Sequence, residues 1–332
     1  MRVLPPATAL PLPCQENPMG KRPSLTRQVE LILSEMNRTT EPTGPGRSRH
    51  AAKAAGQAHQ GIFSHNTYRS IQQRVNTLLG NLPPELRPKL LGDLSPEAMR
   101  WSVAAMRERE LKGVTIRSTL SAMRKLTIGM QLKGWCKLRP DELVPDDLYT
   151  DLTPSAPRGG YSASQVEQIS SRVRLDPRDG PEFERMIRLL VASGLRHNEL
   201  ARLREDDLDR VAGVIRVRSS NAKGGRERLV MPDDPGRAEL KHALATIPTG
   251  RHWLWTDGPI LTRRLQDAIR KACDELAIAP KGLHGLRATF AEAFLHRRMA
   301  TGLNEHQARR ELTQLLGHNR IQVTYRYVPQ LA

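Results

Sequence analysis

Apolar residues recur at helical spacing through the stretch from about residue 59 to residue 145. The segment Thr67–Leu79 has such a period, and Ser95 followed by Pro96 is a typical helix start that leads a second helix to about Lys112, where Gly113 ends it. A third helix is expected over Ile116–Leu132, with its leucines, isoleucines and methionines on one side. The pattern therefore predicts an all-helical domain over residues 59–145.

The first 58 residues have a different composition. They are rich in Pro, Gly, Ser, Thr and Arg, and residues 38–50 show no apolar period at all. Such a composition cannot bury enough apolar surface to form a core, so we predict a flexible arm over 1–58. One short helix is expected within it at Leu25–Met36, where apolar residues share a face.

The pattern becomes mixed after a proline- and glycine-rich linker at 146–160. Alternation at residues 213–218 and 226–231 predicts a β-hairpin around 221–225. Helices are expected at 162–173, 182–192, 261–276, 286–299 and 305–316. The prediction for 161–332 is therefore an α+β domain, mainly α with a small antiparallel sheet, preceded by the all-α domain.

The charge balance restricts the partner. Lys and Arg number 52 against 35 Asp and Glu, a formal net charge of +17 that points to a polyanion, nucleic acid first and an anionic membrane surface second. No apolar run approaches the roughly 20 residues that cross a bilayer. Prolines interrupt the N-terminal apolar residues, so we expect no export. Three widely spaced cysteines suggest neither a disulfide framework nor a metal site and fit a reducing cytoplasm.

Four short segments of the second half contain side chains that could take part in catalysis. They are residues 193–200 (SGLRHNEL), 222–232 (AKGGRERLVMP), 284–290 (HGLRATF) and 315–328 (LLGHNRIQVTYRYV). Together they supply Arg196, Lys223, His284, Arg287 and His318, followed by a tyrosine at 325 or 327.

This set of side chains can hold a phosphodiester without a metal. Arginine forks pair with two phosphate oxygens at once, and histidines add hydrogen bonds to the same oxygens. A lysine on a hairpin can protonate a leaving oxygen, and a tyrosine hydroxyl can serve as nucleophile. Each segment alone is weak evidence, because an isolated His-x-x-Arg is usually a surface helix turn and a lysine in a glycine-rich hairpin is usually solvated.

The four segments in this order resemble the tyrosine recombinase (phage integrase) family. The family pattern reads G-L-R-x-x-E-L, G-K-G-x-x-R-x-V-P-L, H-x-L-R-x-[TS]-F-A and L-G-H, then a tyrosine nine residues on. Tyr327 lies nine residues after His318, so the resemblance favours it over Tyr325. The matching motifs span 193–328, whereas the helical segment resembles the core-binding domain of the family by position only.

The resemblance implies a site-specific recombinase that needs no metal or other cofactor. Tyr327 would attack the scissile phosphate and form a 3′-phosphotyrosine. Arg196, Arg287, His284 and His318 would neutralise the phosphate, Lys223 would protonate the leaving 5′ oxygen, and Glu199 would support the site. Basic residues expected to contact DNA are Arg117, Arg124, Lys125, Arg226 and Arg228.

The partners implied are double-stranded DNA carrying a recombination site, a homotetramer on that DNA, and accessory DNA-bending proteins, with no membrane involved. The location implied is the cytoplasm, in association with the nucleoid.

Two departures from the family pattern carry expectations of their own. The stretch from Arg287 to His318 is longer than usual, and we expect its extra residues, within 297–309, to form a surface insertion. Only five residues follow Tyr327, which leaves no room for a C-terminal helix that docks on the next protomer.

Three other functions compete with recombination. A type IB topoisomerase would use a similar site to relax DNA, and an inactive DNA-binding protein would only occupy a locus. An RNA-binding protein is disfavoured, because aromatic residues make up only 4% of the chain and base stacking would be poorly supplied.

Overall fold

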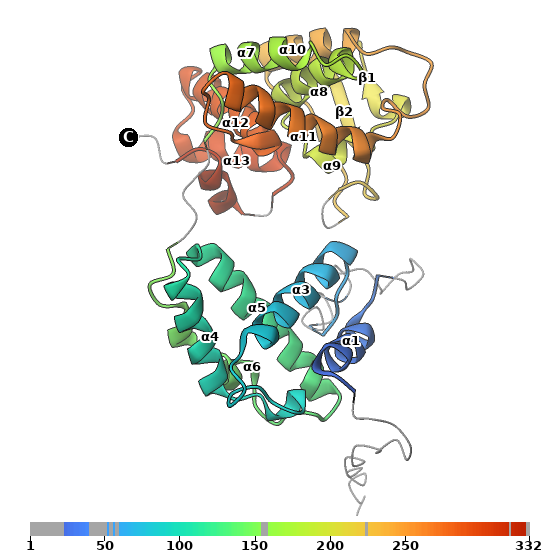
Figure 1. Ribbon diagram of the computed structural model, residues 1–332. Coiled ribbons are helices and arrows are strands. Elements are labelled where there is room, and N and C mark those ends of the chain that lie inside the picture. The colour runs from blue at the N-terminus through green and yellow to red at the C-terminus, as the bar shows by residue number, and fades with distance from the viewer. Residues whose placement is uncertain are drawn as a thin grey trace, which may run out of the picture. The chain divides into compact units, whose positions relative to one another are not determined.

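A computed structural model describes residues 23–39, 52, 56, 60–153, 159–222, 225–318 and 320–329. The chain divides into two compact units, Met1–Ser155 and Ala156–Ala332 (Figure 1). The first unit is helical over its described residues, and the second combines helices with a small antiparallel sheet, which confirms the predicted fold class. No helix among the described residues is long and apolar enough to cross a membrane.

The first unit is built from α-helices and two short 3₁₀ helices around one core. Three of the α-helices begin at a serine whose hydroxyl accepts a backbone N–H of the first turn, the usual N-cap. The elements are α1 (Leu25–Met36), α3 (His65–Asn81), η1 (Leu91–Asp93), α4 (Pro96–Glu108), α5 (Gly113–Leu132), α6 (Pro140–Leu143) and η2 (Asp146–Tyr149).

Helix α1 occupies the bounds predicted for it but is part of the core rather than of the arm. Val29, Ile32 and Leu33 are fully buried in the same cluster as the apolar faces of α3 and α5. The side chain of Gln28 adds polar ties, because it donates to the carbonyl of Lys89 and accepts from the N–H of Leu91. The flexible arm predicted over 1–58 is therefore wrong for this helix, and residues 1–22 lie outside the described part of the chain.

The turn between α4 and α5 also differs from the prediction. Helix α4 ends at Glu108, and Glu110 adopts a left-handed backbone with φ of 53°. Gly113 does not end that helix; it begins α5, where a Cβ would lie 2.9 Å from the backbone nitrogen and oxygen of Thr153. The glycine is required by this close approach of two backbones, a use of glycine that the sequence pattern alone does not separate from helix termination.

In the second unit, helices pack beside a small sheet whose other face is exposed (Figure 1). Its predicted helices are all present, and α10 is an addition that the apolar pattern did not reveal. The helices are α7 (Ala163–Val173), α8 (Gly180–Ser193), α9 (His197–Leu200), α10 (Asp234–Ala245), α11 (Gly258–Glu275), α12 (Gly282–Ala300) and α13 (Glu305–Leu315), with the 3₁₀ helices η3 (Glu205–Asp207) and η4 (Ile321–Arg326).

The sheet has three antiparallel strands in the order β1 (Leu208–Asp209), β2 (Val214–Val217) and β3 (Arg228–Val230). Strands β2 and β3 form the predicted hairpin, with Ile215 opposite Val230. The inward residues Ile215, Val217 and Val230 are buried in the main core of the unit. The two paired strands of the hairpin are thus anchored in the core of the unit.

The stretch from Arg297 to Arg309 is not a surface insertion, as the sequence suggested. Helix α12 continues to Ala300, and Asn304 caps α13 four residues later. Arg297 pairs with Asp233 at 2.9 Å and Arg298 pairs with Glu311 at 2.6 Å, while Arg309 is fully buried. The stretch is therefore part of two helices that pack on each other, and these three arginines have partners inside the unit.

We predict that Gly129 sets the distance between α1 and α5. A Cβ at this position would lie 2.5 Å from side-chain atoms of both Ile32 and Met36. Gly129→Leu should lower the free energy of unfolding by about 2 kcal/mol through overpacking, measured by denaturant unfolding of the full chain. Hydrogen exchange should then rise in α1 and α5.

The control for this prediction is Gly80→Leu on α3, where an added Cβ meets nothing within 4 Å. That variant should be neutral or slightly stabilising because leucine favours helix more than glycine does. Equal losses of stability in the two variants would show that close packing at Gly129 is not the cause.

Candidate active site

The first segment of the candidate site lies at the junction of α8 and α9. Helix α8 ends at Gly194, whose φ of 61° is left-handed and whose Cβ position would clash with the ring of Phe290 at 2.3 Å. A glycine is therefore the residue that can end this helix against α12. The turn places Arg196 as the N-cap of α9 and Glu199 in its first turn, joined by a capping box.

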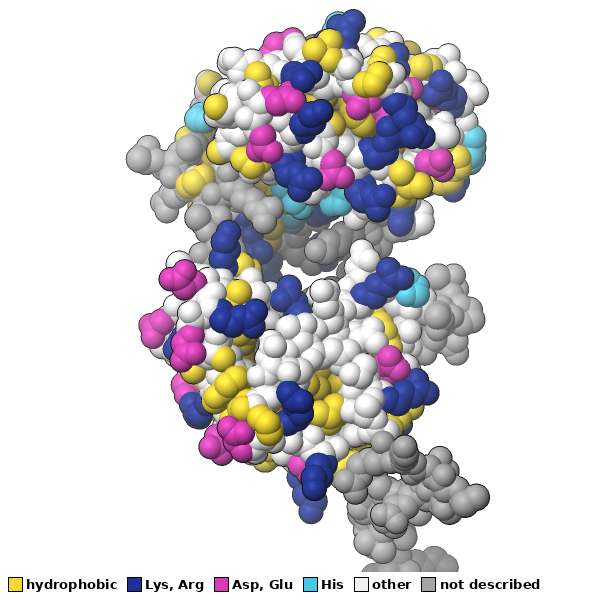
Figure 2. Space-filling view, in the orientation of Figure 1, with side chains coloured by type: hydrophobic (Ala, Val, Ile, Leu, Met, Phe, Trp, Pro, Cys, Tyr) yellow, Lys and Arg dark blue, Asp and Glu magenta, His cyan; other side chains and the backbone are white. Residues whose placement is uncertain are grey.

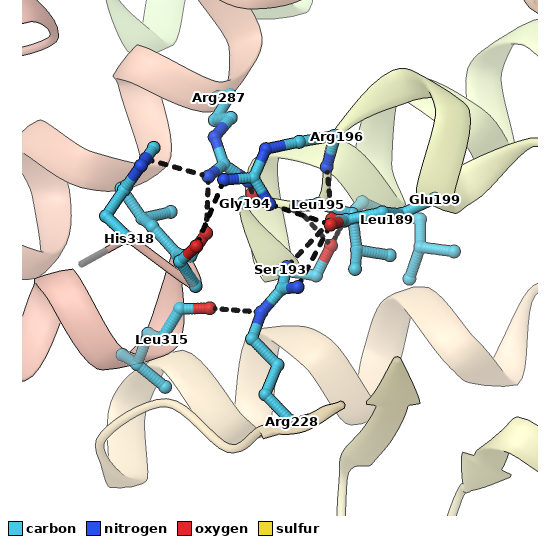
Figure 3. A network of polar contacts seen from close by, with 12 residues as sticks. Leu189, Ser193, Gly194, Leu195, Arg196, Glu199, Arg228, Arg287, Leu315 and His318 are labelled. Carbon is cyan, nitrogen blue, oxygen red and sulfur yellow. Dashed lines mark hydrogen bonds and ion pairs between the residues drawn. The ribbon is translucent and has the colours of Figure 1, made fainter. Parts of the chain in front are cut away.

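A buried carboxylate organises this corner (Figure 3). Glu199 is 1% exposed, and Arg228 pairs with its two oxygens at 3.0 and 2.7 Å. Arg196 donates to the same carboxylate from its guanidinium at 2.8 Å and from its backbone N–H at 2.9 Å. Arg228 also donates from Nε to the carbonyl of Leu315 at 2.8 Å, which ties β3 to the end of α13.

The electrostatics of Glu199 follow from these contacts. Burial alone would raise its pKa, but the hydrogen bonds and charge of Arg228, together with the charge of Arg196, outweigh burial and lower the pKa to about 2. The carboxylate is therefore ionised at neutral pH. Arg228, expected from the sequence to contact DNA, has a side chain only 9% exposed and holds this carboxylate, and its contact with DNA stays a prediction.

Arg287 is the most buried cation of the site, with 1% exposure. Its Nη1 donates to the carbonyl of Gly194, and its Nη2 donates to the carbonyl of Leu316 at 2.7 Å and to Nε2 of His318 at 3.2 Å. Its Nε donates to the hydroxyl of Tyr327 at 3.3 Å. Burial lowers the pKa of Arg287 to about 10, so the guanidinium stays charged at neutral pH.

The turn after α13 and the helix η4 bring the last two candidate residues, His318 and Tyr327, close to Arg287. Gly317, with a left-handed φ of 62°, turns the chain so that His318 lies beside the guanidinium, and η4 then delivers Tyr327. The rings of His318 and Tyr327 lie 5.7 Å apart. Burial and the charges of Arg287 and Arg196 lower the pKa of His318 to about 3, so its imidazole is neutral at neutral pH.

His284 lies in the first turn of α12, one turn before Arg287, and its side chain is exposed. It packs edge-to-face against His197, with ring centroids 5.8 Å apart. His197 was not among the residues singled out from the sequence. Its only signal there is its place directly after Arg196.

The structure therefore brings Arg196, Arg287, His318 and Tyr327 together, and His284 lies one helical turn before Arg287, against His197. Tyr325 points elsewhere, since its ring lies 3.9 Å from the guanidinium carbon of Arg309. Lys223 lies outside the described residues, in the stretch of sequence between β2 and β3. Arg226 belongs to the same stretch and is half-buried.

The basic residues of the first unit are partly engaged within it. Arg117 donates to the carbonyl of Leu152 at 3.0 Å, and Arg124 donates to the carbonyl of Val144 and pairs with Asp146 at 2.6 Å. Lys125 follows on the same helix and is half-buried. Arg124 thus also has a structural role in holding the segment after α6.

Two guanidinium groups, two imidazoles and one phenol hydroxyl can bind and attack an oxyanion-rich centre. The cations are fixed by carbonyls and by Glu199, so they need little reorganisation when an anion arrives. Among the described residues no cluster of His, Cys, Asp and Glu is placed to hold a metal ion. The side chains present are those that suit a phosphate ester.

The sequence of this chain is similar to those of known proteins. Residues 162–332 match the model of the phage integrase family. The tyrosine recombinase XerC of Syntrophus aciditrophicus is 24% identical over 255 residues, which cover 74% of this chain and 79% of the relative. A putative integrase/recombinase of Sinorhizobium fredii, y4rA, is 30% identical over 182 residues, covering 52% of this chain and 42% of the relative.

Solved structures agree in fold. The Tn1549 transposon integrase in complex with transposon right-end DNA matches with a TM-score of 0.57 and 19% identity, covering 86% of this chain and 96% of that one. A lambda integrase dimer bound to a COC′ core site matches with a TM-score of 0.58 and 15% identity, covering 86% and 95%. At this identity the likeness concerns the fold.

We predict that Glu199→Gln lowers the free energy of unfolding by about 3 kcal/mol at neutral pH, because it leaves buried arginine charge without its partner. Since the folded pKa of about 2 lies below the ordinary 4.5, this stabilisation is present above pH 4.5 and is lost as the pH falls toward 2. Denaturant unfolding at several pH values measures both effects.

The matched control is Glu227→Gln, which removes an exposed ion pair with Arg216 on the same sheet. This change should cost less than about 1 kcal/mol. If the two variants lose the same stability, or if Glu199→Gln keeps the full acid dependence of the wild type, Glu199 is not the charged centre of the site.

Proposed function

The chain belongs to the phage integrase family, and we propose that it is a site-specific DNA recombinase that cuts and rejoins strands through a 3′-phosphotyrosine intermediate. One observation carries the proposal most directly. The hydroxyl of Tyr327 lies 3.3 Å from Nε of Arg287, and the ring of His318 is packed beside it. A nucleophile and its charge-stabilising groups therefore converge on one point.

In this reaction the oxygen of Tyr327 attacks the scissile phosphorus and loses its proton. The bond from phosphorus to the 5′ oxygen breaks, and that oxygen leaves as a 5′-hydroxyl after gaining a proton. The tyrosine ester then replaces the phosphodiester. Attack by a 5′-hydroxyl on the phosphotyrosine reverses the step and rejoins a strand, so the ester bond conserves the energy and no cofactor is consumed.

We assign the stabilisation of the pentacovalent state to Arg196, Arg287, His284 and His318. The two guanidinium groups supply fixed positive charge, and the histidines supply hydrogen bonds to nonbridging oxygens. Burial favours these contacts, because charge interactions are stronger where water is excluded. His318 would act in its neutral form, consistent with its lowered pKa.

Glu199 and Arg228 act behind these groups in the proposal. Arg196 is held by the carboxylate of Glu199 and by the carbonyl of Gly317 at 3.3 Å. These contacts set the direction of the fork before a phosphate arrives. Glu199 would therefore orient the guanidinium without touching the substrate, as its position in the family motif suggested.

The partner in this proposal is double-stranded DNA that carries a recombination site. Arg117 and Lys125 of the first unit and Arg226 of the hairpin are the candidates for backbone contacts. Lys and Arg side chains are spread over the visible face of both units, interspersed with acidic ones (Figure 2). Such a surface supports contacts at several phosphates and an association with the nucleoid.

Assembly is a further part of the proposal. Exchange of strands between two sites needs four cleavages, so four protomers on two DNA sites would suffice, with accessory proteins bending the DNA between them. The lambda integrase structure noted above is a dimer on its core site.

The chemistry is tested with nicked suicide substrates taken from the DNA that flanks the gene. Wild type should form a covalent protein–DNA adduct visible on a denaturing gel, and Tyr327→Phe should form none, because it lacks the nucleophilic oxygen. Tyr325→Phe is the matched control and should retain the adduct, since Tyr325 faces Arg309 instead.

Other outcomes point to the alternatives. An adduct that survives in Tyr327→Phe but not in Tyr325→Phe would move the nucleophile. No adduct from wild type on DNA that it binds would favour an inactive DNA-binding protein. Relaxation of supercoiled plasmid without sequence preference would favour a type IB topoisomerase.

The role of Lys223 is tested with a leaving group that needs no acid. On an ordinary substrate, Lys223→Ala should slow cleavage by about 100-fold or more. On a substrate with sulfur in place of the bridging 5′ oxygen, the loss should nearly vanish, because thiols ionise far more readily than alcohols.

Arg226→Ala on the same hairpin serves as control. If it acts through DNA contact, it should weaken both substrates equally. An Lys223→Ala defect of the same size on both substrates would rule out the general-acid assignment and leave Lys223 with a DNA-binding role.

A further inference from the structure

Arg309 on α13 is fully buried, although it belongs to neither the phosphate-binding groups nor a surface described above. A buried guanidinium is costly unless it is paired and its donors are satisfied. Its charge is balanced by Glu305 one turn earlier, which accepts from Nε at 2.6 Å. Nη2 also lies 2.6 Å from the same carboxylate, and both terminal nitrogens have further acceptors beyond α13.

Those donors reach the segment that carries Tyr327, on both sides of it. Nη1 donates to the hydroxyl of Thr324 at 3.3 Å and to the carbonyl of Val328 at 3.0 Å, and Nη2 donates to the carbonyl of Pro329 at 2.7 Å. The 3₁₀ helix η4 ends at Arg326, so these last two carbonyls follow the helix and are satisfied by the side chain. One arginine thus contacts the chain three residues before the tyrosine and at the two residues that follow it.

The same contact separates the two tyrosines. Tyr325 lies within the 3₁₀ helix η4, whereas Tyr327 directly follows its last residue. The ring of Tyr325 lies against the Arg309 guanidinium at 3.9 Å, whereas the hydroxyl of Tyr327 lies at Arg287. Arg309 therefore also fixes the rotation of this segment.

We propose that Arg309 is a positioning residue for cleavage: by clasping residues 324–329 to α13 it holds the hydroxyl of Tyr327 at the phosphate site. The inference rests on the proposed function, because it gives that hydroxyl the role of nucleophile. A displacement of about 1 Å at a reacting atom can cost about 100-fold in rate. The segment has few other polar ties to α13 among the described contacts, so loss of Arg309 should release it.

The test compares Arg309→Gln with Arg310→Gln, a neighbouring arginine that is exposed on the same helix. Single-turnover adduct formation is measured at saturating nicked DNA, together with the Kd for that DNA and peptide-resolved hydrogen exchange. Arg309→Gln should cleave about 100-fold more slowly with its Kd nearly unchanged. Its hydrogen exchange should rise in residues 320–329 and not in α8 or α11. Arg310→Gln should cleave at the wild-type rate.

Arg309→Lys is the control for misfolding, because it keeps a positive charge near Glu305 but cannot donate from two terminal nitrogens as the guanidinium does. It should cleave at a rate between wild type and Arg309→Gln. Wild-type rates in both Arg309 variants would overturn the proposal, as would increased exchange throughout the second unit with loss of DNA binding. Absence of an adduct in wild type would instead refute the proposed function, and exchange confined to 320–329 in Arg309→Gln would still establish the clasp.

Discussion

The carboxylate of Glu199 joins three elements that are far apart in the sequence. It receives Arg196 from the start of α9 and Arg228 from β3, and Arg228 in turn holds the carbonyl of Leu315 at the end of α13. A buried carboxylate with a single partner would be destabilising, but here several donors share it and keep it ionised. The hairpin, Arg196 and the turn before His318 are therefore positioned by one negative charge.

The second constraint is the burial of Arg287. Its donors are used by the carbonyls that end α8 and α13, so it closes the gap between two helix ends as well as facing Tyr327. Helix ends leave carbonyls unsatisfied, and a fork with five N–H groups can serve several of them at once. The group proposed to stabilise the phosphate is thus also part of the core, which keeps it in place before DNA binds.

Arginine side chains hold the site in place from three positions. Arg228 lies behind Glu199, Arg196 and Arg287 line the proposed phosphate position, and Arg309 holds the tyrosine segment from the far side. Several of the arginines that contribute to the net positive charge therefore form ion pairs inside the protein. Net charge alone is a poor guide to which arginines contact DNA.

The sequence by itself determined most of the secondary-structure elements and supplied the candidate residues of the site. Arg196, His284, Arg287, His318 and the late tyrosine stand in short local motifs, and helix caps and alternation are also local, so α1, α7 and the hairpin followed from neighbouring residues. Tertiary structure decided what depends on distant partners. It made Arg228 and Arg309 buried ties rather than surface cations, placed α1 in a core, and turned Tyr327 rather than Tyr325 toward Arg287. An arginine that binds a phosphate and one that neutralises a buried carboxylate have the same letter in the sequence, and only the position of the partner distinguishes them.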